Sequence, residues 1–221
     1  MNIPIVYEDD WLLIVNKPAG LLIIPAPYKA VKDFSEGAPK NAQRTLTSIL
    51  NEDLQQKGAA FHLHPCHRLD RETSGLIIYA KGKSCQKKMM EEFRLKQINK
   101  SYIAFVQGSL PADEGQIRNH IEGKSAVTRY RVIEKRKDFS IVEVEPLTGR
   151  TNQIRIHFKS IGHPLVGETK FAFRKDYALR AKRACLHARA LSFKHPVTGK
   201  SAHVESELAE DLKKFLIEHP R

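Results

Sequence analysis

Short apolar runs closed by turn residues recur along this chain of 221 residues. The run WLLIV (11–15) ends at the turn residues NKPAG (16–20), and a later run, GLIIYA, covers residues 75–80. Runs of this length and composition are typical of buried strands. We therefore expect buried strands at both places and a further strand over SYIAFVQG (101–108).

Regular alternation of apolar and polar residues appears farther along the chain. The segments AVTRYRVIEKR (126–136) and DFSIVEVEP (138–146) are separated by a single residue, and in the second one valines alternate with glutamates. Successive side chains of a strand point to opposite faces, so alternation indicates a strand with one buried face. The two segments predict a pair of antiparallel strands.

Three segments keep the spacing of an amphipathic helix. The first follows Thr45, a residue type that caps helices, and stops at Gly58, while the second starts at Ser84 and the last near Ser206. The apolar positions are Leu46, Ile49, Leu50 and Leu54 in the first segment, Met89, Met90 and Phe93 in the second, and Leu208, Leu212, Phe215 and Leu216 in the last.

The segment TNQIRIHFKSIG (151–162) fits either a strand or a helix. Thr151 can serve as an N-cap and Gly162 as a stop, and these two signals favour the helix. A strand would bury Ile154, Ile156 and Phe158, whereas a helix would bury Ile154, Phe158 and Ile161.

Strands and helices are interspersed without strict alternation. This order predicts an α+β fold with a mixed, largely antiparallel central sheet and flanking helices. We expect a single domain over residues 1–221. Residues 25–44 contain three prolines and many charges without a clear period, so we expect a long exposed loop there.

The charge of the chain narrows the class of partner. There are 37 Lys and Arg against 25 Asp and Glu, which gives a net charge of +12 and a pI near 9.6. Basic residues cluster at 81–100, 129–137 and 174–183. Because phosphate contacts release counterions, such a balance favours a protein with a nucleic-acid partner over a merely basic soluble protein. We expect a basic cleft with these clusters at its rim.

The cysteines and the N-terminal segment bear on the compartment. The three cysteines lie far apart and form no Cys-x-x-Cys pair, which argues against both a disulfide framework and a thiolate zinc site. The first residues carry acids where a signal peptide carries bases, and no apolar run reaches the ~18–20 residues of a membrane span. We expect a cytoplasmic protein, with a monomer as the default.

The stretch FHLHPCHRLDRETSGLIIYAK (61–81) concentrates the chemistry-bearing residues. His62, His64 and Cys66 would share one side of an extended strand, and a metal-dependent hydrolase using His62, His64 and His67 is one interpretation. Zinc sites, however, usually draw ligands from two separate segments or from a helix, and neither His-Glu-x-x-His nor Cys-x-x-Cys occurs here. We expect no metal.

The single carboxylate Asp70 offers the other interpretation of this stretch. It stands between Arg68 and Arg71, whose guanidinium groups would favour its ionised form. A charged carboxylate in a basic cleft can act as a nucleophile, a general base or an ion-pair partner. An aspartate in a turn before a strand more often only caps or pairs, so this segment alone leaves the role open.

Five segments in order resemble the motifs of the RluA class of pseudouridine synthases. Together they span roughly residues 5–200, and their shared order makes the resemblance specific. The segments are NKPAG (16–20), HRLDRETSGL (67–76) with Ala80 and Lys81 beyond it, KSYIA (100–104), LTGRTNQIRIH (147–157) followed by GHPL (162–165) and Gly167, and LHA (186–188) followed by HPVTG (195–199).

The sequence departs from this family at a few places. Asn152 stands where the family often has histidine, and Glu168-Thr169-Lys170 where aspartate and a later aromatic residue are common. The loop at 25–44 is long for the family. There is no room before residue 5 for the small RNA-binding domain that many relatives carry, so we expect the catalytic domain to bind RNA alone.

The resemblance implies isomerisation of uridine to pseudouridine in ribosomal RNA, transfer RNA or both, without a metal or cofactor. It implies that Asp70 is the catalytic carboxylate, that Arg155 pairs with it, and that Tyr102 stacks on the flipped uracil and helps remove the proton from its carbon 5. Arg68, Leu186 and Lys81 would bind the substrate, with Arg68 filling the space that the base leaves. The alternative is a non-catalytic RNA-binding or ribosome-assembly protein.

Overall fold

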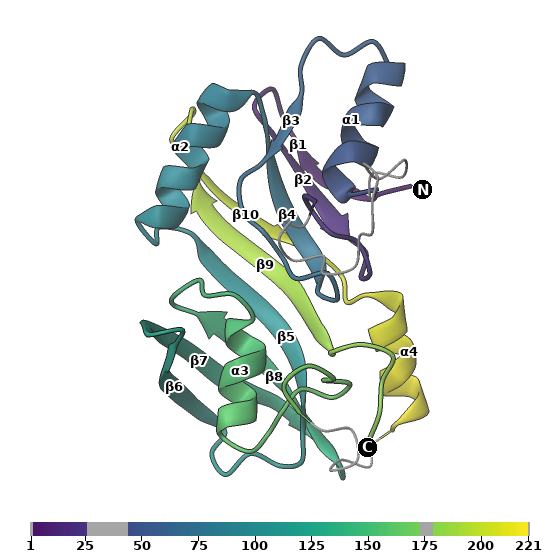
Figure 1. Ribbon diagram of the computed structural model, residues 1–221, viewed down its shortest axis with the longest axis vertical. Helices are drawn as coiled ribbons and strands as arrows, with labels where there is room; N and C mark the ends of the chain where they lie inside the picture. Colours follow the sequence, from purple (N-terminus) through teal and green to yellow (C-terminus); the bar gives the residue numbers. More distant parts are fainter. Residues whose placement is uncertain (1, 26–43, 173–178, 221) are drawn as a thin grey trace, which may run out of the picture.

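The protein is built around one mixed β-sheet, which in the computed structural model has ten strands within the described residues 2–25, 44–172 and 179–220 (Figure 1). The strands are β1 (Ile5–Glu8), β2 (Leu12–Lys17), β3 (Leu63–Pro65), β4 (Ser74–Lys81), β5 (Asn99–Gln107), β6 (Glu114–Ile121), β7 (Lys124–Lys135), β8 (Phe139–Pro146), β9 (Leu186–Lys194) and β10 (Ser201–Glu205). The helices are α1 (Leu46–Gln56), α2 (Lys83–Arg94), α3 (Gln153–Ser160) and α4 (Glu210–Glu218).

The strand order confirms a mixed, largely antiparallel sheet. The main path runs β1-β2-β4-β9-β5-β8-β7-β6, with β10 beside β9 and β3 beside β4. All of these pairs are antiparallel except β4 with β9. The buried strands predicted at 11–15, 75–80 and 101–108 and the strand pair at 126–146 are all present. The strands β1, β6, β9 and β10 were not predicted.

The parallel contact between β4 and β9 joins the two halves of the sheet. It is short, with Ser74 opposite His187 and Gly75 opposite Ala188. Gly75 has φ +112°, and a Cβ atom there would lie 2.3 Å from the carbonyl oxygen of Ala188. Only glycine tolerates both this conformation and this close approach. The contact places the turn before β4 directly beside β9.

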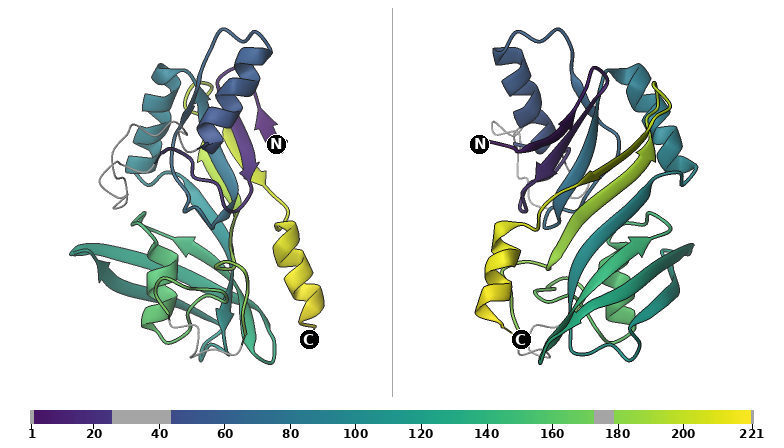
Figure 2. Two further views of the ribbon diagram at one scale, coloured as in Figure 1. Left: turned by 45° about the vertical axis from the view of Figure 1, so that its right-hand side comes forward. Right: turned by 180° about the vertical axis from the view of Figure 1, so that it is seen from behind.

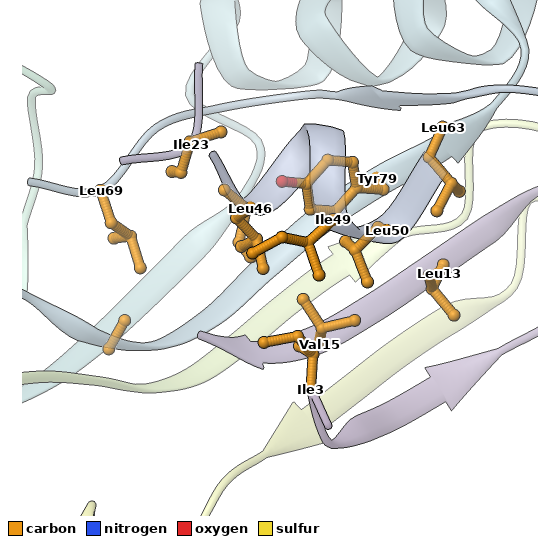
Figure 3. Packing of buried hydrophobic residues seen from close by; sticks show 12 residues of the cluster. Ile3, Leu13, Val15, Ile23, Leu46, Ile49, Leu50, Leu63, Leu69 and Tyr79 are labelled. Carbon is orange, nitrogen blue, oxygen red and sulfur yellow. The ribbon is translucent and has the colours of Figure 1, made fainter. Parts of the chain in front are cut away.

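Helices cover both faces of the sheet in each half. Figure 3 shows Leu46, Ile49 and Leu50 of α1 packed with Val15 and Tyr79, while α2 packs on the opposite face of β2 and β4. In the other half, α3 and α4 lie on opposite faces of β5 and β8, as the views of Figure 2 show. Strands covered on both faces are apolar throughout, which explains the short apolar runs in the sequence.

The predicted helices are present, with corrections at their ends. The first helix has the expected cap, because the Thr45 hydroxyl accepts a hydrogen bond from the Ser48 amide. The second begins after Gly82, not Ser84, and its Met90 is exposed. The last begins at Glu210, four residues after Ser206.

The ambiguous segment at 151–162 is a helix, α3, but Thr151 does not cap it. The residue before the helix is Asn152, in a left-handed conformation with φ +54° and without a capping side-chain bond. The predicted loop at 25–44 lies almost entirely outside the described residues. Within the described residues, no helix combines the length and apolar character that crossing a membrane requires.

Candidate active site

A cleft of about 1270 Å³ lies between the two halves of the sheet. Its walls come from the segment 66–73 and α2 on one side, and from the turn at 146–152 and the start of α3 on the other. The structure brings five of the six residues expected at the site into its lining: Arg68, Asp70, Tyr102, Arg155 and Leu186. These residues are up to 118 positions apart in the sequence, and the β4–β9 contact brings them together.

Asp70 lies in the turn that precedes β4, half-buried in this cleft. Its carboxylate makes no hydrogen bond or ion pair with any side chain in the described part of the protein. Burial raises the pKa of Asp70 above its ordinary value, and the positive charges of Arg155, Arg68 and Lys170 offset only part of that effect. Arg68 thus favours the ionised form as expected, but the net shift of this pKa is upward, because desolvation outweighs the charges.

Two buried cations hold the backbone that carries Asp70. Lys17, which is fully buried, donates hydrogen bonds from Nζ to the carbonyl oxygens of Pro18, Leu21 and Arg71. From the other side, Arg183 donates to the carbonyl oxygen of Glu72 at 3.0 Å. The backbone of the two residues after Asp70 is thus anchored from both sides, which holds the turn that carries the carboxylate.

The Arg183 anchor extends to the C-terminal helix. Its Nε and Nη2 lie 2.6 and 2.9 Å from the carboxylate oxygens of Asp211 in α4, and its Nη2 also donates to the hydroxyl of Ser74. The Ser74 hydroxyl lies 2.9 Å from Nδ1 of His187, which continues the network into β9. A buried polar network satisfied in this way is rigid. The candidate site is therefore tied to α4 as well as to β2.

Arg155 projects from the first turn of α3, and its partner is Glu168. Nε and Nη2 of Arg155 donate to the two oxygens of Glu168 at 2.7 Å each, and Nη2 lies 3.2 Å from Oε2 of Glu72. The predicted pairing with Asp70 is wrong, since no ion pair joins Arg155 and Asp70. Arg155 acts on Asp70 only through its charge at longer range, where it favours the ionised form.

The Glu168 carboxylate accepts four hydrogen bonds, two of them from Arg155. Its Oε1 also accepts hydrogen bonds from the backbone amides of Lys170 and Phe171. Burial alone would raise the pKa of Glu168, but the Arg155 hydrogen bonds and these amides lower it below its ordinary range. The carboxylate therefore stays ionised and keeps the guanidinium fixed at the edge of the cleft.

Tyr102 and Leu186 form the apolar floor of the cleft. The register of β5 against β9 shifts between Ser101 and Tyr102, and such a shift changes the direction of the side chains after it. Burial, and then the negative charge of Asp70, raise the pKa of Tyr102, so its phenol stays protonated at neutral pH. Such a phenol offers an aromatic face and a hydrogen-bond donor, and it accepts a proton only by giving up its own.

Arg68 and Lys81 differ in their relation to the cleft. Arg68 is exposed at its edge and makes no hydrogen bond or ion pair with described residues. Lys81 is at the far end of β4, about 23 Å along the strand from Ser74, where it pairs with Glu8 at 2.8 Å. The structure does not bring Lys81 to the candidate site.

The side chain of His67 serves packing and hydrogen bonding. Nε2 of His67 accepts a hydrogen bond from the amide of Ile78, and its ring packs on Phe93 with centroids 4.6 Å apart. Burial lowers the pKa of His67 to about 3, so the ring is neutral. Across residues 2–25, 44–172 and 179–220, no three His, Cys, Asp or Glu side chains gather in a way that would hold a metal ion.

Three residues of the site were missed as site residues in the sequence: Lys17, Lys100 and Glu168. Each stands in or near a motif, but no local signal shows that Lys17 is buried or that Glu168 reaches Arg155. Seven Lys and Arg line the cleft against four carboxylates, which agrees with the expected basic character: Arg68, Arg94, Lys96, Lys100, Arg129, Arg150 and Arg155 against Asp70, Glu143, Glu145 and Glu205.

Comparisons with known proteins point to one family. The family model described as RNA pseudouridylate synthase matches residues 11–160. The chain is 34% identical to an uncharacterized RNA pseudouridine synthase, YlyB, of Bacillus subtilis, with 98% of this chain and 72% of that protein covered. It is 33% identical to the dual-specificity RNA pseudouridine synthase RluA of Yersinia pestis, covering 92% and 98%.

Solved structures show the same fold. Human RNA Pseudouridylate Synthase Domain Containing 4 matches with a TM-score of 0.77 and 22% identity, over 97% of this chain and 92% of that one. Human RNA Pseudouridylate Synthase Domain Containing 1 matches with a TM-score of 0.72 and 23% identity, over 98% and 94%. The arrangement of sheet and helices is thus shared across low sequence identity.

Proposed function

The chain belongs to the RNA pseudouridylate synthase family, and we propose that it isomerises uridines of structured RNA with Asp70 as the catalytic carboxylate. The observation that carries this proposal is the position of Asp70. It is a half-buried carboxylate without a protein partner among the described residues, held by an anchored backbone inside a basic cleft. A carboxylate placed in this way is available to a substrate and is not used by the fold.

The reaction breaks one bond and forms another on the same base. The bond from N1 of uracil to carbon 1′ of ribose breaks, the base turns, and carbon 5 bonds to the same ribose carbon. The hydrogen of carbon 5 leaves as a proton and N1 takes up a proton, so the product is an isomer and no electrons enter or leave. The ribose carbon and the uracil ring are both chemically possible points of attack for the Asp70 carboxylate.

The surrounding side chains suit a flipped uracil. Tyr102 provides an aromatic face for stacking, and Leu186 provides apolar contact beside it. Arg155, fixed by Glu168, contributes positive charge near Asp70 and favours its reactive, ionised form. We assign these three residues to binding the base and to tuning the carboxylate.

A uridine within a folded RNA has to leave its stack before it reaches Asp70. Flipping costs a few kcal/mol and is easiest in loops and at mismatches. Arg68, exposed at the edge of the cleft without a partner among described residues, is suited to stack its planar guanidinium in the vacated space. We therefore propose stem-loops as the preferred form of the substrate.

The names of relatives support ribosomal RNA as a substrate, and we include transfer RNA on the ground of the family resemblance. One relative is named a dual-specificity enzyme, and another, from Yersinia pestis, a ribosomal large subunit pseudouridine synthase. The three cysteines of this chain are all free and buried, which suits a reducing compartment. We propose that the protein acts in the cytoplasm as a monomer on such RNA.

The experiment uses total RNA that lacks pseudouridine, incubated with the protein without added metal or cofactor. New pseudouridines are mapped at nucleotide resolution for the wild type, for Asp70→Ala and for Asp53→Ala, which removes an exposed carboxylate of α1 as a matched control. We expect defined sites with the wild type and the control and none with Asp70→Ala. A folded wild type that binds RNA but makes no pseudouridine would refute the proposal.

A further inference from the structure

Lys100 lies in the candidate cleft without any assigned role. It stands in β5, two residues before Tyr102, and its side chain is half-buried in the cleft lining. Its amine makes no hydrogen bond or ion pair with any described residue. Burial lowers the pKa of Lys100, and no nearby carboxylate opposes that effect.

The other buried basic side chains near the cleft all have ion-pair or hydrogen-bond partners. Arg155 has Glu168 and Glu72, and Arg183 has Asp211. Lys17 donates to three backbone carbonyl oxygens. A half-buried ammonium without such a partner is free to bind an anion that the free protein does not supply.

The turn at 147–151 approaches the Lys100 amine at a glycine. A Cβ atom on Gly149 would lie 4.0 Å from Nζ of Lys100. Gly149 has no positive φ, so its backbone conformation does not require glycine. A methyl group there would make an ordinary van der Waals contact with the amine and narrow the room between it and the turn 147–151, which also belongs to the cleft lining.

We propose that Lys100 and Gly149 form a seat for one phosphate of the RNA backbone, next to the uridine that enters the cleft. This inference rests on the proposed function, because the same cleft must accept an RNA strand. Lys100 supplies the charge and Gly149 the space. A phosphate is the anion that every RNA strand brings to this point, and an ammonium is a usual partner for it.

Four variants separate this proposal from a structural role: Lys100→Gln, Lys100→Arg, Gly149→Ala and, as control, Lys214→Gln. Lys214 is exposed on α4, outside the cleft lining. The substrate is a stem-loop around a uridine that the wild type converts in total RNA. We expect Lys100→Gln to raise KM about tenfold with Tm unchanged or higher, because it removes a buried unpaired charge.

Salt dependence gives a second, independent measure. Affinity for RNA falls as the salt concentration rises. One lost phosphate contact makes the slope of log affinity against log salt concentration less steep by about 0.7–0.9. We expect that loss for Lys100→Gln, a restored slope for Lys100→Arg and the wild-type slope for Lys214→Gln. Gly149→Ala keeps the charge but fills the space, so we expect it to raise KM.

The phosphate itself is identified by replacing single phosphates of the stem-loop with neutral methylphosphonates. At one position next to the target uridine, the methylphosphonate should lower the affinity of the wild type. The same replacement should cause no further loss of affinity in Lys100→Gln. Additive losses at every position, or a Lys100→Gln protein that behaves like Lys214→Gln, would overturn the phosphate seat and leave the proposed function standing. A wild type that converts no uridine would overturn both.

Discussion

Arg155 and Glu168 form a buried two-point ion pair, in which Nε and Nη2 each lie 2.7 Å from a carboxylate oxygen. Glu168 holds a guanidinium that faces the cleft, and this guanidinium favours ionised Asp70 through space. The pair thus acts on the Asp70 carboxylate without a hydrogen bond or ion pair to it, while Arg155 contacts Glu72 in the same turn. Arg155 carries the charge that acts on Asp70, and Glu168 fixes the position of that charge.

Removing the Glu168 carboxylate should therefore harm both stability and activity. Glu168→Gln leaves the Arg155 charge buried without its main partner, and we expect a loss of about 3 kcal/mol in the free energy of unfolding. Glu72→Gln removes the more exposed partner and should cost less than about 1 kcal/mol. Urea denaturation measures the free energy of unfolding of the two variants. Equal effects of the two substitutions would contradict the role of Glu168.

The ionised carboxylate of Asp70 should lower the stability of the fold. Its folded pKa is raised above 3.8, so the ionised carboxylate destabilises the fold at pH values above the folded pKa. That cost disappears below the unfolded pKa, where both states are protonated. Asp70→Asn should therefore be at least as stable as the wild type at about pH 7, with a difference that fades as the pH approaches 3.8.

Thermal melts of Asp70→Asn and the wild type across this pH range measure the effect. An Asp70→Asn protein that melts lower than the wild type at neutral pH would show that the fold depends on this carboxylate. The expected gain in stability, together with lost activity, is the pattern of a residue kept for function.

The β4–β9 contact should be intolerant of any side chain at Gly75. A Cβ atom there meets backbone at 2.3 Å and also requires φ +112°, so Gly75→Ala should cost more than about 3 kcal/mol. Gly123→Ala is a matched control, with φ +73° and open space around the added atom, and should cost about 1 kcal/mol. Comparable losses in urea denaturation would argue against the close contact as the reason for glycine.

Arg68 should matter most when the target uridine is stacked. We expect Arg68→Ala to reduce turnover on a stem-loop more than on an unpaired strand with the same target, because an unpaired base leaves no stack to fill. Initial rates on the two substrates give the ratio. Equal losses on both would mean that Arg68 contributes only charge.

The sequence was sufficient for elements whose signal is local. The buried strands β2 and β4 are short apolar runs because helices cover both of their faces. The strand β6 was missed because its residues EGQIRNHI bury only Ile117 and Ile121. A strand that is mostly exposed has little hydrophobic signal of its own, and its pairing with β7 decides its structure.

The candidate site was predictable in its residues more than in its contacts. Motif order indicated Asp70, Tyr102 and Arg155, and all three line one cleft. The partner of Arg155 depends on how α3 packs beside the turn that carries Glu168, and no spacing in the sequence encodes that arrangement. The resemblance placed Lys81 in the site, but an extended strand carries it away from Asp70.

The most direct test of the central claim is release of tritium from RNA labelled at carbon 5 of uridine. Forming the new bond at that carbon expels its hydrogen, so release counts each turnover. We predict release by the wild type without added metal or cofactor, and none by an Asp70→Asn protein that is folded and still binds the RNA. Release by Asp70→Asn at the wild-type rate would contradict the assignment of Asp70 as the catalytic carboxylate.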